Sequence, residues 1–280
     1  MKHNLAIIIP TYKQYFELSP SEKLSLRRTF EVLGSYDIVF VTHNGIDAEA
    51  YYQCGKSKSS IQVLNFSDEY FTGLEGYNKL LLGLEFYKNF VQYDYILICQ
   101  LDVFVFADKL DYFIDKKYDY IGAPWFEGFG TATPESPIKG VGNGGFSLRK
   151  VKSFLRVRYA MEIFSGHHIS YNVLKEAARH SIELLRIVKH EYHRRTQTYD
   201  EALPWDTPLY EDCYWATIVP TFFPWFKIGS VDDATRFAFE VNPRVLYALN
   251  EDVLPMATHA WEKYDPDFWR PFIEPINEGK

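Results

Sequence analysis

The sequence has few cysteines, no long apolar run and no excess of positive charge. Its three cysteines, Cys54, Cys99 and Cys213, lie far apart without a C-x-x-C, so neither a disulfide framework nor a zinc site is indicated. A reducing cytoplasm is the simplest compartment for such a chain. The apolar run Leu5–Ile9 stops at Pro10, and no run reaches the roughly 18 residues of a transmembrane helix. We therefore expect neither a signal segment nor a membrane span, which leaves open a peripheral contact with the inner face of a membrane.

The charge balance also limits the function. A net charge of −7 over 280 residues argues against non-specific binding of nucleic acid. Any phosphate group must instead be met locally, by a few Lys or Arg side chains, by helix N-termini or by a metal ion. With 47% hydrophobic and 24% charged residues, the composition is that of an ordinary soluble globular protein. Aromatic residues reach 18%, and their rings suit the apolar faces of sugars, although much of this content will be core.

The most informative stretch is YILICQLDVFVF, at Tyr95–Phe106. The run Tyr95–Cys99 is almost wholly apolar, which is typical of a strand covered on both faces in an α/β sheet. Gln100 and Asp102 follow, and an acid at the end of a buried strand is costly to desolvate unless it is paired or binds a metal. Ligands bind at the carboxyl ends of such strands, so Asp102 is placed to meet a cation and a phosphate. The alternative is an Asp102 that caps a turn and faces solvent.

The order of the expected elements predicts an α/β fold with parallel, right-handed crossovers. We find no repeat and no linker, and therefore expect a single domain over residues 1–280, with residues 1–110 as the nucleotide-binding half. Residues 111–280 would form the acceptor half, and the proline-rich tail would wrap the surface without long elements. The expected strands are Leu5–Ile9, Tyr36–Thr42, Ile61–Phe66, Tyr95–Cys99, Val103–Phe106 and Tyr118–Ile121. The expected helices run from Ser21 to Gly34, over Phe71–Phe90 and over Phe154–Ile187, with Val231–Glu240 a strand or short helix and Tyr264–Ile276 the tail.

An apolar strand, a D-x-D and a second apolar run resemble the nucleotide-sugar glycosyltransferases of the GT-A fold, whose sheet is Rossmann-like, mostly parallel and flanked by helices. The resemblance implies that Asp102 binds a divalent metal, Mn or Mg, that holds the diphosphate of the donor. This chain reads Q-L-D, as in a bacterial branch of the family, so Gln100 stands where the first Asp is expected. Gln100 can hydrogen-bond a ribose hydroxyl but is a weaker cation ligand than a carboxylate.

Two further stretches match the family's donor side. IIIPTYK resembles its first strand and exit loop, which implies that Thr11 and Tyr12 cradle the nucleotide. Asn78 and Lys79 lie on the helix before the Asp102 strand, where the family carries residues that face the donor; Lys79 would stabilise the leaving diphosphate. The alternatives are an ordinary strand-to-helix turn and a solvated helix face.

The stretch GNGGFSLR resembles the family's segment that lines the donor and acceptor sugars, here Asn143, Gly144 and Gly145. Its glycines allow close backbone approach and positive φ, without the pattern of a phosphate loop. Asn143 is a candidate ligand of a sugar hydroxyl, or else a turn residue, since Asn tolerates the left-handed conformation. Arg149 is open to a purely structural role.

EDCYWA resembles the acid pair that supplies the base in many inverting members of the family. We expect Asp212 to be that base and Glu211 to bind an acceptor hydroxyl, with the reverse assignment open. The alternative is helix capping by both carboxylates. A late His completes the metal shell in several members, which implies that His259 is a second metal ligand; the alternative is a hydrogen-bonded core histidine. We interpret the remaining histidines of the long helical region as solvated and not as ligands: His167, His168, His180, His190 and His193.

Together these motifs imply a glycosyltransferase that moves a sugar from a nucleotide-sugar, with UDP favoured, to a glycan or lipid-linked acceptor in polysaccharide biosynthesis. The prediction that the transfer inverts the anomeric carbon of the sugar rests on the acid pair alone. One alternative is a non-catalytic glycan-binding protein on a decayed GT-A fold, which Gln100 favours. Another is a sugar nucleotidyltransferase, which would need a glycine-rich phosphate loop after the first strand, whereas Pro10–Tyr15 contains no glycine.

Overall fold

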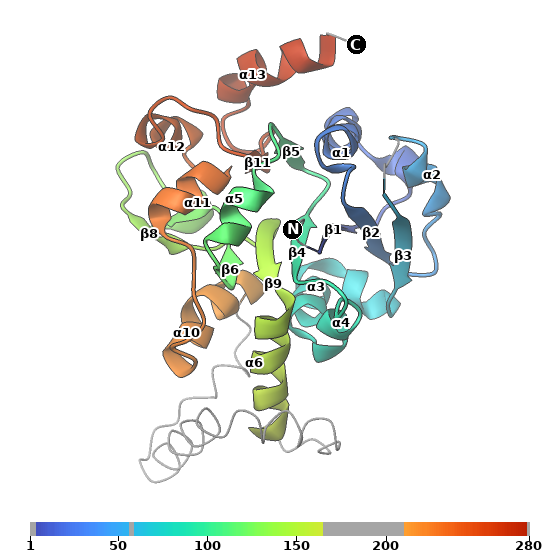
Figure 1. The fold of residues 1–280 in the computed structure, drawn as a ribbon. Helices are drawn as coiled ribbons and strands as arrows, with labels where there is room; N and C mark the ends of the chain where they lie inside the picture. The colour runs from blue at the N-terminus through green and yellow to red at the C-terminus, as the bar shows by residue number, and fades with distance from the viewer. Residues whose placement is uncertain (1–3, 56–58, 165–209, 279–280) are drawn as a thin grey trace.

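A six-stranded sheet forms the centre of the protein, with helices on both faces (Figure 1). In the computed structural model, residues 4–55, 59–164 and 210–278 are described. The strand order is β3-β2-β1-β4-β9-β6; β3, β2, β1 and β4 pair in parallel, and β9 runs antiparallel to both of its neighbours. This confirms the predicted α/β class with a mostly parallel sheet. The strands are β1 (Leu5–Pro10), β2 (Asp37–Thr42), β3 (Ile61–Asn65), β4 (Tyr95–Cys99), β6 (Tyr120–Ile121) and β9 (Phe146–Lys150).

Alternation along β1 explains the two helical layers. Leu5, Ile7 and Ile9 pack in one core with α1, whereas Ala6 and Ile8 pack in a second core with α3, α4 and α6. Successive side chains of a strand point to opposite faces, so a run that is apolar at every position requires cover on both. The helices are α1 (Pro20–Leu33), α2 (Glu49–Tyr52), α3 (Gly73–Leu82), α4 (Leu84–Lys88), α5 (Leu110–Asp115), α6 (Val151–Phe164), α9 (Glu211–Cys213), α10 (Val219–Phe222), α11 (Val231–Phe237), α12 (Pro243–Leu249) and α13 (Pro266–Glu278). No helix within the described ranges has the length and apolar character needed to cross a bilayer.

Two small sheets extend the fold beyond the central one. In the first, β11 (Ala257–His259) lies between β10 (Ala238–Phe239) and β5 (Val103–Val105). In the second, β7 (Pro124–Phe126) pairs with β8 (Ile138–Val141). The antiparallel register of β11 and β5 sets His259 opposite Val103, and the Ala260 amide donates to the Asp102 carbonyl at 3.1 Å. This pairing brings the end of the chain to the acid that follows β4.

Two helix predictions need correction at their ends. The predicted helix Phe71–Phe90 is two helices, α3 and α4, because Gly83 adopts an extended conformation with ψ of 136° between them. The first helix begins one residue before Ser21, with Ser19 as its N-cap in a capping box. Of the long helical region predicted over Phe154–Ile187, α6 lies within the described residues and the part from 165 on lies outside them.

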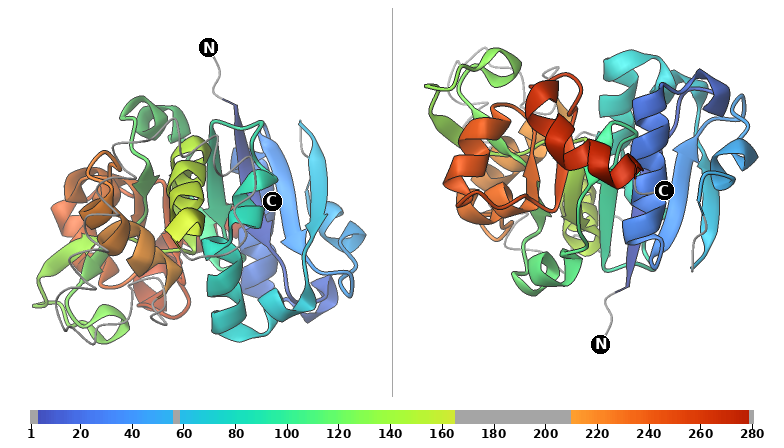
Figure 2. Two further views of the ribbon diagram at one scale, coloured as in Figure 1. Left: turned by 90° about the horizontal axis from the view of Figure 1, so that it is seen from below. Right: turned by 90° about the horizontal axis from the view of Figure 1, so that it is seen from above.

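The prediction that the tail forms no long element is wrong. Residues Pro266–Glu278 form α13, although Pro271 and Pro275 lie inside it. Phe268, Trp269 and Ile273 are buried in a third core, which Leu24 of α1 also contacts, and Figure 2 shows α13 reaching across toward α1. The apolar burial outweighs the backbone hydrogen bonds that the two prolines remove.

Close packing of backbone fixes the segment between β8 and β9. A Cβ atom on Gly122 would lie 1.6 Å from the carbonyl oxygen of Gly142, whereas one on Gly140 would meet nothing within 4 Å. The chain after β6 therefore lies directly against the segment that leads into β9, and only a residue without a side chain fits there.

We expect Gly122→Ala to destabilise the protein by about 1–3 kcal/mol or more, because rigid backbone must move to admit a methyl group. Gly140→Ala is the matched control and should leave the stability nearly unchanged. Urea denaturation followed by circular dichroism measures both. Equal stabilities of the two variants would contradict the proposed constraint.

Candidate active site

The strand order creates a crevice at the carboxyl ends of β1 and β4. After β1, the chain adds β2 and β3 on one side of β1 and then returns to add β4 on its other side. Ligands of open α/β sheets bind where the strand order reverses in this way. A cavity of about 320 Å³ lies there. Tyr12 after β1 and Gln100 and Asp102 after β4 line it, and its aromatic wall includes Tyr70 and Tyr77.

His259 is the centre of a polar cluster at the inner end of this crevice. Its Nε2 atom lies 3.3 Å from Asp102 Oδ1 and 3.2 Å from Gln100 Oε1, and its Nδ1 atom lies 2.9 Å from Glu240 Oε1. Burial alone would lower the pKa of His259, but the carboxylates of Asp102 and Glu240 outweigh burial and raise it to about 10. The structure thus brings the two predicted metal ligands, Asp102 and His259, together with Gln100, and it adds Glu240, which the sequence reasoning missed.

The donor set of this cluster fits a divalent cation. Asp102 is about half exposed and offers a carboxylate, Gln100 an amide oxygen and His259 an imidazole nitrogen, all of which bind such ions. Glu240 on the opposite ring nitrogen is the arrangement that orients metal-binding histidines. Within the described ranges, no cluster of three His, Cys, Asp or Glu side chains is suited to a metal ion. The shell would therefore depend on Gln100 in the position where an acid is usual.

The turn before β9 depends on Asn143. Asn143 has φ of +80° and is 2% exposed, and its Oδ1 accepts from the amides of Gly145 and Phe146 at 2.8 and 3.3 Å. Its Nδ2 lies 3.1 Å from His259 Nδ1, the ring nitrogen that also lies 2.9 Å from Glu240 Oε1. Asn143 is a turn residue here, and this geometry gives no support to its prediction as a sugar ligand.

The glycines of this turn serve close approach and not positive φ. Neither Gly144 nor Gly145 has a positive φ, which corrects that part of the prediction. A Cβ on Gly144 would lie 2.2 Å from Glu211 Oε1, and a Cβ on Gly145 would lie 2.2 Å from His259 Nε2. Because Gly144 and Gly145 have no side chains, Glu211 and His259 can both lie close to the backbone of this turn.

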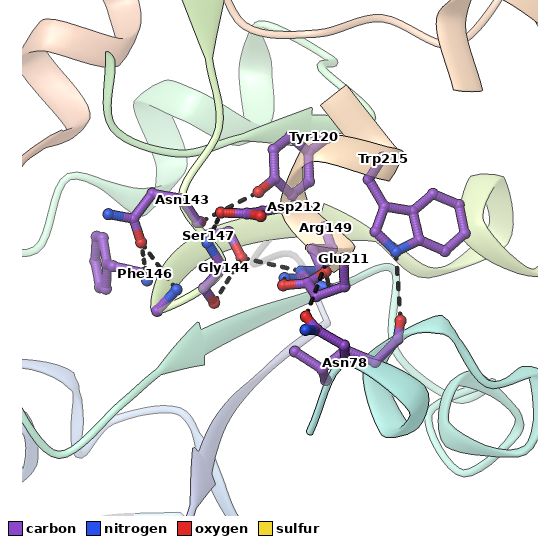
Figure 3. A network of polar contacts seen from close by, with 12 residues as sticks. Asn78, Tyr120, Asn143, Gly144, Phe146, Ser147, Arg149, Glu211, Asp212 and Trp215 are labelled. Atoms are coloured by element: carbon purple, nitrogen blue, oxygen red, sulfur yellow. Dashed lines mark hydrogen bonds and ion pairs between the residues drawn. The ribbon is translucent and has the colours of Figure 1, made fainter. Parts of the chain in front are cut away.

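Arg149 and Glu211 form a buried, bidentate ion pair (Figure 3). The Arg149 guanidinium donates to both carboxylate oxygens of Glu211 at 2.8 and 2.9 Å, and the two side chains are 0% and 3% exposed. Burial alone would lower the pKa of Arg149, but Glu211 raises it well above its ordinary value, whereas burial raises the pKa of Glu211 to about 7 although Arg149 opposes that shift. The Glu211 amide donates to Asn78 Oδ1 at 2.9 Å, so Asn78 caps this segment.

Asp212 lies beside the same turn with a different environment. Its Oδ2 accepts from the Gly144 amide at 3.2 Å, and its Oδ1 accepts from the Cys213 amide at 2.8 Å. Burial raises the pKa of Asp212 above its ordinary value, although both amides oppose the shift. Both oxygens of Glu211 are held by a guanidinium, whereas each oxygen of Asp212 accepts from a backbone amide. The two carboxylates therefore differ in the groups that engage their oxygens.

The remaining predicted residues lie at different distances from the crevice. Thr11 is buried below it, and Lys79 is on the exposed face of α3, where it pairs with Glu75 at 2.8 Å and does not line the cavity. Two other lysines, Lys13 and Lys263, line a neighbouring cavity of about 310 Å³ together with Asp102. Sequence reasoning missed both, and the position of Lys263 four residues after His259 was the available signal. The five histidines interpreted as solvated lie outside the described residues: His167, His168, His180, His190 and His193.

Comparison with protein families places most of the site inside one family model. The model described as "Protein of unknown function (DUF5672)" matches residues 60–259. The chain belongs to this family. The part that matches the DUF5672 family includes Asp102, the 143–145 turn, Asp212 and His259, whereas the loop after β1 lies outside it. A search of curated proteins gave no match.

Several solved structures are similar in outline to this DUF5672 member, and three of them are described as follows. A glycosyltransferase involved in the glycosylation of the major capsid of PBCV-1 is 11% identical, with a TM-score of 0.44 and coverage of 91% of this chain and 92% of that chain. Mouse xyloside xylosyltransferase 1 is 12% identical, with a TM-score of 0.47 and coverage of 92% and 96%. The galactosyltransferase LgtC with donor and acceptor sugar analogues is 14% identical, with a TM-score of 0.43 and coverage of 91% and 86%. Likeness at this level is too low to argue for an activity.

We expect Arg149→Met to destabilise the protein by about 3–5 kcal/mol, because it leaves the Glu211 carboxylate buried without its partner. The double variant Arg149→Met with Glu211→Leu should recover most of that loss, since no unpaired charge remains. Lys79→Met, in an exposed pair with Glu75, is the control and should give no measurable change. Urea denaturation measures all three, and a double variant less stable than Arg149→Met would contradict the assignment.

Proposed function

We propose that the protein is a glycosyltransferase that transfers a sugar from a nucleotide-sugar, with a UDP-sugar favoured, to a hydroxyl of a glycan or lipid-linked acceptor. One observation carries the proposal: the turn at 143–145 contacts both an acid that could accept a proton and a cluster that could bind a cation. Gly144 contacts Asp212, a partly buried acid whose oxygens accept from backbone amides, and Gly145 packs against His259, which contacts Asp102. An acid that could accept a proton and a cluster suited to a cation thus lie against the same turn.

The donor would bind along the crevice with its base against the aromatic wall of the cavity. Asp102, His259 and Gln100 would hold a Mn or Mg ion, which supplies positive charge opposite the donor diphosphate when it is bound. Glu240 would fix the orientation of the His259 ring through Nδ1. The presence of Gln100 in place of an acid predicts a modest affinity for the ion.

Lys13 and Lys263 would hold the diphosphate in this proposal, in place of Lys79. Both lysines line a cavity that shares Asp102 with the aromatic one, so a diphosphate near Asp102 lies within their field. The chain has a net charge of −7, and local cations are therefore needed to attract a phosphate. Lys79 faces away, in its pair with Glu75.

The reaction would be a displacement at the anomeric carbon of the donor sugar. The acceptor oxygen forms a bond to that carbon while the bond from the carbon to the phosphate oxygen breaks, and the electron pair leaves with the diphosphate. Asp212 takes the proton of the acceptor hydroxyl. Glu211 holds Arg149 and has no oxygen free for an acceptor, so we assign it a positioning role instead of the binding role expected from the sequence.

A glycan-binding protein without activity is the second candidate. Gln100 favours it, since the described residues contain no group of three acidic, imidazole or thiol side chains that could hold a metal ion. A decayed site would still offer aromatic walls to a sugar but would lose the metal-dependent affinity for a nucleotide. Nucleotide binding therefore separates the two candidates.

We expect one of UDP, GDP and CDP to bind the protein with an affinity that rises when Mn²⁺ is added, and we expect Asp102→Ala to abolish that rise. Isothermal titration calorimetry with and without the ion measures it. Lys79→Met is the control and should bind as the wild type does, because Lys79 lies outside the cavity. Binding that is independent of metal would remove Asp102 and His259 as ligands, and no binding of any of the three nucleotides would favour the second candidate.

We expect Asp212→Asn to lower kcat by about 10²–10⁴-fold without weakening the donor, because it removes only the proton acceptor. The base works when deprotonated, so wild-type kcat should fall as the pH drops through a pKa that burial has raised above that of an ordinary Asp. Steady-state kinetics over a pH range measure both effects. Asp232→Asn, at an exposed acid of α11, is the control. If kcat of Asp212→Asn still fell at low pH as it does in the wild type, Asp212 would be excluded as the base.

A further inference from the structure

Glu22 lies between the two cavities of the crevice, and the proposed function gives it no role. One cavity has the aromatic wall, and the other is lined by Lys13 and Lys263. Among the residues that the structure describes, Glu22 and Asp102 alone line both cavities. Since Asp102 contacts His259 and belongs to the cluster suited to a cation, Glu22 is the residue of this boundary that can meet another part of the donor.

The chemistry of a nucleotide determines which part of the donor lies at that boundary. In the proposed function, the base lies in the aromatic cavity and the diphosphate lies near Lys13 and Lys263. The ribose is bonded to both, because one of its carbons carries the base and another carries the diphosphate. The ribose therefore lies where the two cavities meet, beside Glu22.

The Glu22 carboxylate is held in one place at the start of α1. Its Oε2 accepts from the Ser19 amide at 2.8 Å in the capping box of this helix, and its Oε1 accepts from the Lys13 ammonium at 2.8 Å. An ionised carboxylate has about four acceptor positions, so each oxygen can accept a further hydrogen bond. The side chain is 15% exposed and lines both cavities, so a ligand that spans them can reach it.

A fixed carboxylate of this kind suits a sugar hydroxyl and not a phosphate. A ribose hydroxyl can donate to it, and an acid has this role in other α/β folds that bind nucleotides. An ionised phosphate oxygen can only accept, so the Lys13 ammonium would bind the phosphate and Glu22 would not. The ion pair of Lys13 and Glu22 thus presents a cation and an acceptor side by side, as a ribose and its phosphate require.

Resting on the proposed function, we propose that the Glu22 carboxylate accepts a hydrogen bond from the 2′ or 3′ hydroxyl of the donor ribose and so selects ribonucleotides. Lys13, which the same carboxylate contacts, binds the diphosphate. Glu22 is then a specificity residue for the nucleotide and takes no part in the proton transfer.

The test measures by calorimetry how strongly each variant distinguishes a ribonucleotide from its deoxy forms in the presence of Mn²⁺. The probe is the one of UDP, GDP and CDP that binds the wild type most tightly, together with its 2′-deoxy and 3′-deoxy forms. We expect the wild type to bind at least one deoxy form about 10–100-fold more weakly, which is the effect of one hydrogen bond to a charged group. Glu22→Met removes the acceptor and should abolish this ratio, and Glu22→Gln keeps a neutral acceptor and should reduce it.

Two further variants separate the ribose contact from neighbouring effects. Lys13→Met should weaken the ribonucleotide and its deoxy forms by the same factor, because it acts on the diphosphate. Glu31→Met is the matched control, since Glu31 is another acid of α1, pairs with Arg28 at 3.2 Å and lines neither cavity. It should change no affinity. Each ratio is measured within one variant, so a change in stability or in the field around the diphosphate cancels.

Three outcomes would contradict the inference. A wild type that binds the deoxy forms as tightly as the ribonucleotide would overturn it and leave the proposed function intact. A Glu22→Met variant that keeps the wild-type ratio would do the same. A wild type that binds none of the three nucleotides would overturn the proposed function, and this inference with it.

Discussion

The buried ion pair of Arg149 and Glu211 is the constraint on which the site depends. Two charges without access to water must stay together, because either one alone would be costly to bury. The pair joins the end of β9 to the start of α9 across 62 positions of sequence. It therefore fixes where α9 begins and, one residue after Glu211, where the Asp212 carboxylate lies. Such a pair need not add net stability to the fold. Its contribution here is to hold the Asp212 carboxylate in one position.

The position of Glu211 also determines how closely the turn before β9 is packed. Glu211 lies so near the turn before β9 that residue 144 must be glycine, and the same turn meets His259 at residue 145. Asn143 takes the left-handed conformation and closes the turn with its own side chain. On the far side, the pairing of β5 with β11 sets His259 against Asp102. Asp212 and the cluster around His259 are thus held against one turn by segments that lie far apart in the sequence.

Local patterns predicted the fold well and the roles of the site residues less well. Apolar runs identified the central strands, and the acid after β4 pointed to Asp102. The helix α13 was missed because its prolines disfavour a helix locally, and burial of Trp269 in a distant core decides the matter. No local signal pairs Arg149 with Glu211, since the two are far apart in sequence. Glu240 was missed for the same reason, because only the alignment of β10 with β11 brings it to His259.

The arrangement bears on the stereochemistry of the proposed transfer. The lysines that would hold the diphosphate line a cavity with Asp102, whereas Asp212 contacts the turn through Gly144. In an inverting displacement, the acceptor hydroxyl that gives its proton to a base approaches the anomeric carbon from the side away from the leaving phosphate. Retention would instead place the acceptor on the side of the diphosphate, where Asp212 has no proton to take. Inversion is therefore tied to the role of Asp212, and the stereochemistry of the product tests the position of the base independently of any rate.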